Sequence, residues 1–135
     1  MSESMKAQGM SRTTMMRTAE ELAQAQLLAY NAKDLDSFVA CYSEDVRVWR
    51  LASGAAMPPL PLQPQLQGRA AFRELYRQGP FAAPQVQAEV TQRIVMGDTV
   101  IDHERVHGRG EGVQQVAVVY RCREGLIAEV YFFLP

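Results

Sequence analysis

The chain has 135 residues, of which 47% are hydrophobic and 21% are charged, values typical of one globular domain. Its net charge of −1 excludes a broad basic surface, so we expect neither nucleic acid nor an acidic membrane among its partners. No apolar run approaches the roughly 20 residues of a membrane span, and no secretory signal is visible, so we expect a cytoplasmic protein.

The first half of the chain predicts an arm and two helices. Residues 1–17 are polar and lack periodicity, so we expect an irregular arm followed by one domain over residues 18–135. Thr18 and Glu21 form a capping-box pattern at the start of a helix. Its inner face is formed by Leu22, Ala23, Gln26, Leu27 and Tyr30. Asp34 caps a shorter second helix, whose inner face carries Leu35, Phe38, Val39 and Tyr42.

A strand, a long loop and a third helix follow. Residues 43–45 predict a turn and residues 46–51 a strand, in which Val46, Val48 and Arg50 share one face. Residues 52–67 contain four prolines and predict a loop beside the mouth of any pocket, either a spacer or a lid. Residues 68–78 predict the third helix, which Gly79-Pro80 ends.

The second half of the chain predicts strands alone. We expect four of them, over residues 85–96, 99–107, 113–123 and 126–134, joined by turns at residues 97–98, 108–112 and 124–125. A helix-rich half followed by a strand-rich half favours an α+β fold. In it, three helices pack on one face of a curved, mostly antiparallel sheet.

Five short segments, in this order, carry a family resemblance. They are YNAKDLD at residues 30–36, YSEDV at 42–46, GRAAF at 68–72, GD at 97–98 and EGLI at 124–127. The set resembles the nuclear transport factor 2-like superfamily, in particular its SnoaL-like and ketosteroid isomerase-like members, over residues 18–134. The resemblance implies a cone-shaped fold around an apolar ligand pocket, and a homodimer through the outer face of the sheet.

The strand pattern independently favours covered surfaces on both faces of the sheet. In the last two predicted strands both faces are largely apolar, whereas a sheet with one wet face alternates apolar with polar residues. Helices cover one face, and a second subunit is the simplest cover for the other. We expect Trp49, Tyr131 and Phe133 in that interface.

The catalytic trio of ketosteroid isomerases is missing from the matching positions. The aspartate base falls on Arg50, the first-helix tyrosine on Gln26 and the protonated aspartate on Val118. Arginine stays protonated near neutral pH and cannot serve as a general base. The sequence therefore argues against steroid isomerisation by that mechanism.

The polar strand at residues 101–105 holds the candidate catalytic residues Asp102, His103 and Glu104. Strand alternation places Asp102 and Glu104 on one face, and His103 and Arg105 on the other. The sequence leaves open which pair faces the pocket, because a one-residue slip exchanges the faces. A structural ion-pair network is an equally good interpretation. The candidate ligand-binding residues are Arg50, Val48, Tyr76, Arg105, Val118, Tyr120 and Phe132.

Cysteine and histidine content favours neither a disulfide nor a metal site. Cys41 and Cys122 form no spacing motif, and we expect them as buried thiols, on a helix face and in a strand. His103 and His107 have no clear third metal ligand beside them. We therefore expect no metal and no cofactor.

Two functions remain open at this point. The first is a small-molecule-binding SnoaL-like protein with isomerase, lyase or hydrolase chemistry on a mostly apolar ligand. In it, Arg50 anchors an anionic or carbonyl group, and Asp102, His103 or Glu104 moves a proton. The alternative is a non-catalytic dimeric binding or scaffold module, which a cavity filled by its own side chains would favour.

Overall fold

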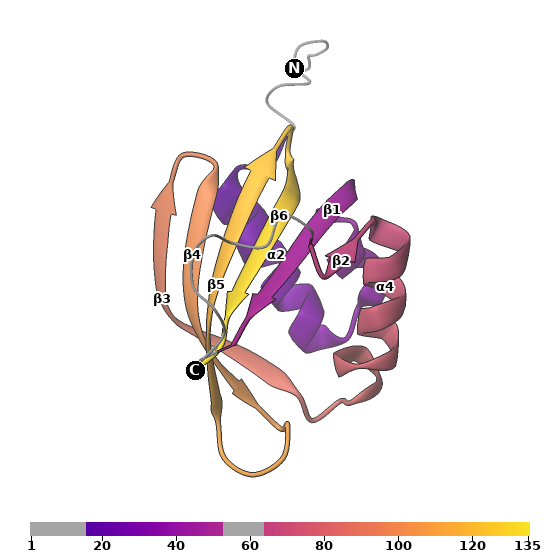
Figure 1. Ribbon diagram of the computed structural model, residues 1–135, viewed down its shortest axis with the longest axis vertical. Helices are drawn as coiled ribbons and strands as arrows, with labels where there is room; N and C mark the ends of the chain where they lie inside the picture. The colour runs from indigo at the N-terminus through magenta and orange to yellow at the C-terminus, as the bar shows by residue number, and fades with distance from the viewer. Residues whose placement is uncertain (1–15, 53–63) are drawn as a thin grey trace, which may run out of the picture.

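Helices cover one face of a six-stranded sheet in the computed structural model, which describes residues 16–52 and 64–135 (Figure 1). In chain order the strands are β1 (Tyr42–Leu51), β2 (Leu66–Gln67), β3 (Gln87–Met96), β4 (Thr99–His107), β5 (Gln114–Arg123) and β6 (Leu126–Phe133). The sheet order is β2-β1-β6-β5-β4-β3, with β1 and β6 parallel and all other neighbours antiparallel. The predicted α+β class with a mostly antiparallel sheet is confirmed.

The helical layer consists of α2 (Ala19–Ala32), α3 (Leu35–Val39) and α4 (Arg69–Gln78), with a 3-10 turn at Pro80–Ala82. The predicted capping box is present: Thr18 N–H donates to Glu21 Oε1 at 2.9 Å, and Glu21 N–H donates to Thr18 Oγ1 at 3.1 Å. The Asp34 side chain accepts from Ser37 N–H and begins α3 as expected.

Side chains at the C-terminal end of α2 form hydrogen bonds with the backbone around the start of β3. The Asn31 side chain accepts from Ala88 N–H and donates to Ala88 C=O, both at 2.8 Å, as a neighbouring strand would. Lys33 adopts a left-handed φ of 60° at the helix end, and its ammonium donates to Val86 C=O. These bonds fix α2 over β3 and β4, and the cavity lies beneath this helix.

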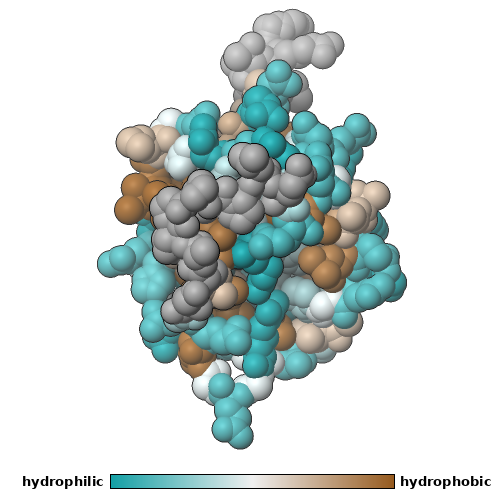
Figure 2. Space-filling view, in the orientation of Figure 1, coloured by the Kyte–Doolittle hydropathy of each residue, from teal (hydrophilic) through white to brown (hydrophobic). Residues whose placement is uncertain are grey.

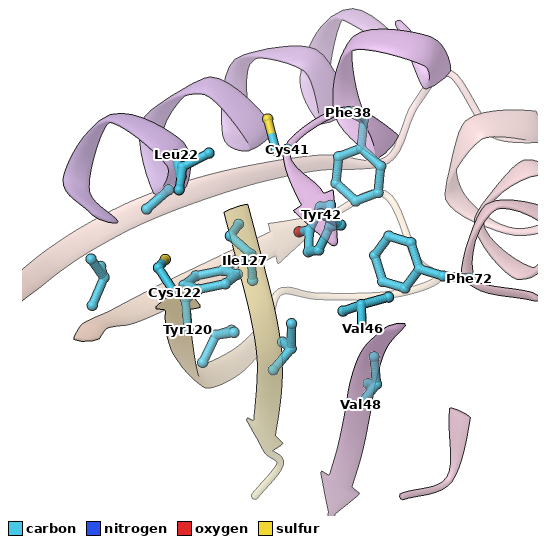
Figure 3. Close-up of a cluster of buried hydrophobic side chains, with 14 of the residues drawn as sticks. Leu22, Phe38, Cys41, Tyr42, Val46, Val48, Phe72, Tyr120, Cys122 and Ile127 are labelled. Atoms are coloured by element: carbon cyan, nitrogen blue, oxygen red, sulfur yellow. The ribbon is translucent and has the colours of Figure 1, made fainter. Parts of the chain in front are cut away.

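Aromatic rings fill the space between the helices and β1. The Phe38 ring lies 5.1 Å from that of Tyr42 and 5.6 Å from that of Phe72, centroid to centroid (Figure 3). Tyr76 and Phe81 add rings at 5.0 Å from Phe38. Because such packing leaves little freedom to shift, the cluster gives the adjoining cavity a rigid wall.

Three sequence predictions are corrected here. Residues 43–45 do not form a turn but belong to β1, whose pairing with β6 is interrupted between Tyr42 and Arg47, so that these polar residues protrude. Cys41 lies in the connection between α3 and β1, not on a helix. The predicted loop at 52–67 ends in β2, which pairs with β1. Residues 53–63, and the predicted arm up to residue 15, lie outside the described residues.

The outer face of the sheet carries an apolar row that crosses five strands. Trp49 pairs in register with Tyr131, Tyr131 with Val119, Val119 with Ile101, and Ile101 with Ile94. The Trp49 and Tyr131 rings stack at 4.7 Å. In Figure 1 α2 lies behind the sheet, and Figure 2, in the same orientation, shows hydrophobic residues between hydrophilic ones.

Candidate functional site

A partly open cavity lies between the helical layer and the inner face of the sheet. Its lining comprises Gln26, Leu27, Tyr30, Phe38, Tyr42, Arg50, Tyr76, Ala88, Glu104, Val106, Arg109, Gln114, Val116, Tyr120, Phe132 and Leu134. The volume of the cavity is about 70 Å³. This is below the roughly 300–1,000 Å³ of typical ligand pockets, so a small ring system is the largest ligand to expect, with part of it in the open mouth.

Among the described residues that line the cavity, Glu104 is the only one with a carboxylate. The register of β4 turns Asp102 and Glu104 inward, where their exposed fractions are 0% and 7%. Burial, and then the nearby charge of Asp102, raise the pKa of Glu104 from 4.5 to about 7, although Tyr120 and Arg93 oppose the rise. Near neutral pH this carboxyl can therefore both accept and donate a proton.

Asp102 is satisfied by a cation and so plays a different part. Arg93 on β3 donates a hydrogen bond to each carboxylate oxygen of Asp102, from Nε to Oδ1 at 2.7 Å and from Nη2 to Oδ2 at 3.0 Å. A third nitrogen of Arg93 donates to Gln24 Oε1 at 2.9 Å. Asp102 is absent from the cavity lining, and its charge contributes to the raised pKa of Glu104.

A chain of hydrogen bonds runs from the aromatic cluster to Glu104. The Tyr42 hydroxyl donates to Gln26 Oε1 at 3.0 Å, and Gln26 Nε2 donates to the Tyr120 hydroxyl at 3.1 Å. The Tyr120 hydroxyl donates in turn to Glu104 Oε2 at 3.3 Å. Gln26 Nε2 also donates to Ala23 C=O, which holds its amide in this orientation. The chain leaves Glu104 Oε1 available to a ligand.

Two guanidinium groups lie at the mouth. The Arg50 guanidinium carbon is 5.4 Å from the centre of the Phe132 ring, within cation–π range. Arg109, on the loop between β4 and β5, lies beside the Tyr30 hydroxyl. Burial raises the pKa of Tyr30, and the charge of Arg109 opposes that rise. Both arginines also line the shallow hollow outside the cavity.

The structure brings some of the predicted site residues together and separates others. Arg50, Tyr76, Glu104, Tyr120 and Phe132 line the cavity. The predicted ligand-binding residues Val48 and Val118 are buried in the core, outside the lining. His103 and Arg105 lie on the outer face, where His103 Nε2 is 2.7 Å from Gln115 Oε1. The alternative in which Asp102 and Glu104 face inward is thus the one observed.

Sequence reasoning missed several polar residues of the site. Gln26 and Tyr42 were assigned to apolar helix faces, and the amide of Gln26 on such a face was a signal that it needed polar partners. Arg109 was placed in a glycine-rich turn without a role, because the contact that brings this loop to the mouth is made with a distant segment.

Three further features bear on function. Within residues 16–52 and 64–135, no group of three or more His, Cys, Asp or Glu side chains could hold a metal ion. Among the same residues, every helix is too short or too polar to cross a bilayer. Cys41 and Cys122 are both buried and unbridged.

A family model described as a SnoaL-like domain matches residues 23–130. A putative ketosteroid isomerase from Kribbella flavida has a TM-score of 0.69 at 22% identity, over 90% of this chain and 82% of that one. A SnoaL-like protein of unknown function from Burkholderia thailandensis has a TM-score of 0.66 at 16% identity, over 87% of this chain and 93% of that one. A computationally designed 17-OHP binder has a TM-score of 0.72 at 16% identity, over 87% of this chain and 90% of that one. No curated protein matches the sequence. At these identities the solved structures show a shared fold alone.

Proposed function

The chain belongs to the SnoaL-like domain family, and we propose that it is a small-molecule-binding member that moves a proton on an apolar ligand at Glu104. One observation carries the proposal. The single carboxylate among the described lining residues is buried in the cavity, between apolar side chains and tyrosine hydroxyls, and its pKa is raised to about 7. General acid–base catalysis works best when the pKa of the catalytic group lies near the working pH.

The neighbours of Glu104 supply its positioning. Tyr120 holds Oε2 through its hydroxyl, and Gln26 and Tyr42 hold Tyr120. Burial raises the pKa of the Tyr120 hydroxyl well above its ordinary value, as do the charges of Glu104 and Asp102, so that hydroxyl stays a donor. A ligand oxygen that displaces Oε2 from Tyr120 would receive this hydrogen bond, while Oε1 takes a proton from an adjacent carbon.

The reaction class follows from the number of acid–base groups. With one carboxyl in the described lining, the same group takes the proton and returns it. This suits isomerisation, or elimination by a lyase, more than hydrolysis, which needs a second group to position water. The apolar wall, formed by Leu27, Phe38, Val106, Val116, Phe132 and Leu134, would hold the ring of the ligand.

The test uses 2-tetralone, an apolar bicyclic ketone with acidic protons beside its carbonyl. Deuterium exchange at that carbon, followed by proton NMR in deuterium oxide, should be accelerated by the wild type. Glu104→Gln should lower this rate at least about 100-fold, since general bases contribute about 10²–10⁴-fold. The matched control is Glu44→Gln on the protein surface, where the side chain is 88% exposed.

The outcomes separate the two candidate functions. Tetralone that raises the melting temperature without exchanging faster would favour the non-catalytic binding module. Exchange that is equally fast in Glu104→Gln and in the wild type would contradict the assignment of Glu104.

We also propose a homodimer through the apolar row of the outer face. Trp49 is already buried within the single chain, whereas Phe133 and Ile101 are each 36% exposed and Ile94 is 60% exposed. An exposed apolar row in a sheet is an aggregation hazard unless another surface covers it. Sedimentation equilibrium should give a dimer for the wild type and a monomer for Ile101→Lys. A monomeric wild type at about 100 μM would contradict the dimer.

A further inference from the structure

The loop that carries Arg109 is held against a segment more than twenty residues earlier in the chain. Gly108 has a φ of +91°, and a Cβ on it would lie 2.1 Å from Gln85 C=O oxygen, closer than real carbon atoms approach. Only glycine allows this approach. The next residue, Arg109, is thereby directed to the mouth of the cavity, beside Tyr30.

Arg50 reaches the same mouth from β1 and is held in place on two sides. Its backbone N–H donates to Gln65 Oε1 at 2.5 Å, and its C=O accepts from Gln65 Nε2 at 2.9 Å. In the parallel pairing with β6, Arg50 stands opposite Phe132, whose ring its guanidinium contacts. The guanidinium is thus positioned by backbone bonds and by an aromatic face.

These two arginines differ from six others in the described chain. Arg47, Arg69, Arg73, Arg77, Arg93 and Arg123 each lie within 4.0 Å of a carboxylate. No carboxylate of residues 16–52 or 64–135 lies within that distance of Arg50 or Arg109. Arg17, Arg105 and Arg121 also lack such a partner among these residues, but they do not line the cavity. Arg50 and Arg109 thus place two positive charges at the mouth of the cavity, in a chain whose net charge is −1.

We propose that Arg50 and Arg109 form an anion site at the cavity mouth, and that the ligand is a ring compound bearing one carboxylate. The inference rests on the proposed function, because the ring must occupy the same cavity. A guanidinium fork matches the two oxygens of a carboxylate. A monoanion suits the site better than a dianion, since Glu104 shares the cavity and repels further negative charge when ionised. The carboxylate lies at the mouth, and the ring reaches inward to Glu104.

The test compares two probes of nearly equal shape, 2-naphthoate and 2-naphthamide, by isothermal titration calorimetry. Hydrogen bonds to charged groups contribute about 1.5–3 kcal/mol, so the wild type should bind naphthoate about 10- to 100-fold more tightly than naphthamide. Arg50→Met and Arg109→Met, which keep an unbranched apolar stem, should each weaken naphthoate binding about 10-fold and naphthamide binding less than 2-fold. Raising the salt concentration from 0.05 to 0.5 M should weaken naphthoate binding alone.

A matched control and a folding check complete the design. Arg123→Met removes an exposed arginine at the opposite end of β5 from the mouth, and it should leave both affinities unchanged. Thermal denaturation of each variant checks that it is folded.

Equal affinity of the wild type for naphthoate and naphthamide would overturn the anion site while leaving the proposed pocket function in place. So would a preference for naphthoate that survives in both arginine variants. If neither probe binds and 2-tetralone also fails to bind, the proposed function falls, and the anion site with it.

Discussion

The replacement Glu104→Gln should make the protein more stable at alkaline pH but not at acidic pH. In the folded state the pKa of Glu104 is about 7, against an ordinary value of 4.5. A carboxyl whose pKa is raised by folding contributes stability that is fully present below the unfolded pKa and is lost as the pH rises through the folded pKa. The window is therefore about pH 4.5 to 7. Glutamine has almost the same shape, carries no charge and keeps an oxygen that can accept from Tyr120.

The magnitude follows from the shift itself. At about 1.4 kcal/mol for each pKa unit, ionised Glu104 costs the folded state about 3 kcal/mol. The difference in unfolding free energy between Glu104→Gln and the wild type should grow by about 2.5 kcal/mol from pH 5 to pH 8. Titrating groups distant from Glu104 are shared by both proteins and cancel in this difference to first order.

The assay is urea denaturation at several pH values, followed by the fluorescence of Trp49, the single tryptophan, and by circular dichroism. Glu44→Gln, which removes an exposed carboxylate, should give a difference from the wild type that does not change with pH in this window. A constant difference between Glu104→Gln and the wild type from pH 5 to pH 8 would show that folding does not raise the pKa of Glu104.

Three further substitutions have defined outcomes. Tyr120→Phe removes the hydrogen bond that lowers the pKa of Glu104, so carbon-13 NMR of the Glu104 carboxyl should show a titration midpoint above 7. Asp102→Asn leaves the Arg93 guanidinium without its buried counter-charge and should cost about 3 kcal/mol in urea denaturation. Gly108→Ala forces a backbone clash at 2.1 Å and should cost at least about 2 kcal/mol in the same assay.

Each of these three predictions has a control variant or a result that would contradict it. Gly110 also has a positive φ, of +98°, but open space around its Cβ position, so Gly110→Ala separates the clash from the backbone strain. Equal losses for the two glycine variants would contradict the close approach. An unchanged or lower midpoint in Tyr120→Phe, or a fully stable Asp102→Asn, would contradict the contacts described for Glu104 and Asp102.

Local patterns in the sequence were sufficient for most of the fold. The capping box at Thr18 and Glu21, the cap at Asp34 and the hairpin at Gly97-Asp98 depend on neighbouring residues and were predicted correctly. Residues 43–45 have the composition of a turn, but they lie in β1 between Tyr42 and Arg47, which both pair with the distant β6. Tertiary pairing on either side of these residues thus prevailed over local preference.

The site was predictable only in part, for the same reason. Alternation along β4 grouped Asp102 with Glu104, but the inward face is decided by packing against α2 and by pairing with β5. The position of Arg109 depends on the contact between Gly108 and the segment before β3. The orientation of the Gln26 amide depends on tyrosine hydroxyls from two other elements. No spacing rule within one segment could have revealed contacts of this kind.

We propose above that Glu104 exchanges protons with a ligand in the cavity. The pH dependence of kcat/KM for deuterium exchange on 2-tetralone tests this proposal. The rate should rise with pH to a plateau, with a midpoint near 7 set by ionisation of Glu104, and it should be lost in Glu104→Gln. A rate without a midpoint between about pH 6 and 8, or a midpoint that persists in Glu104→Gln, would contradict it.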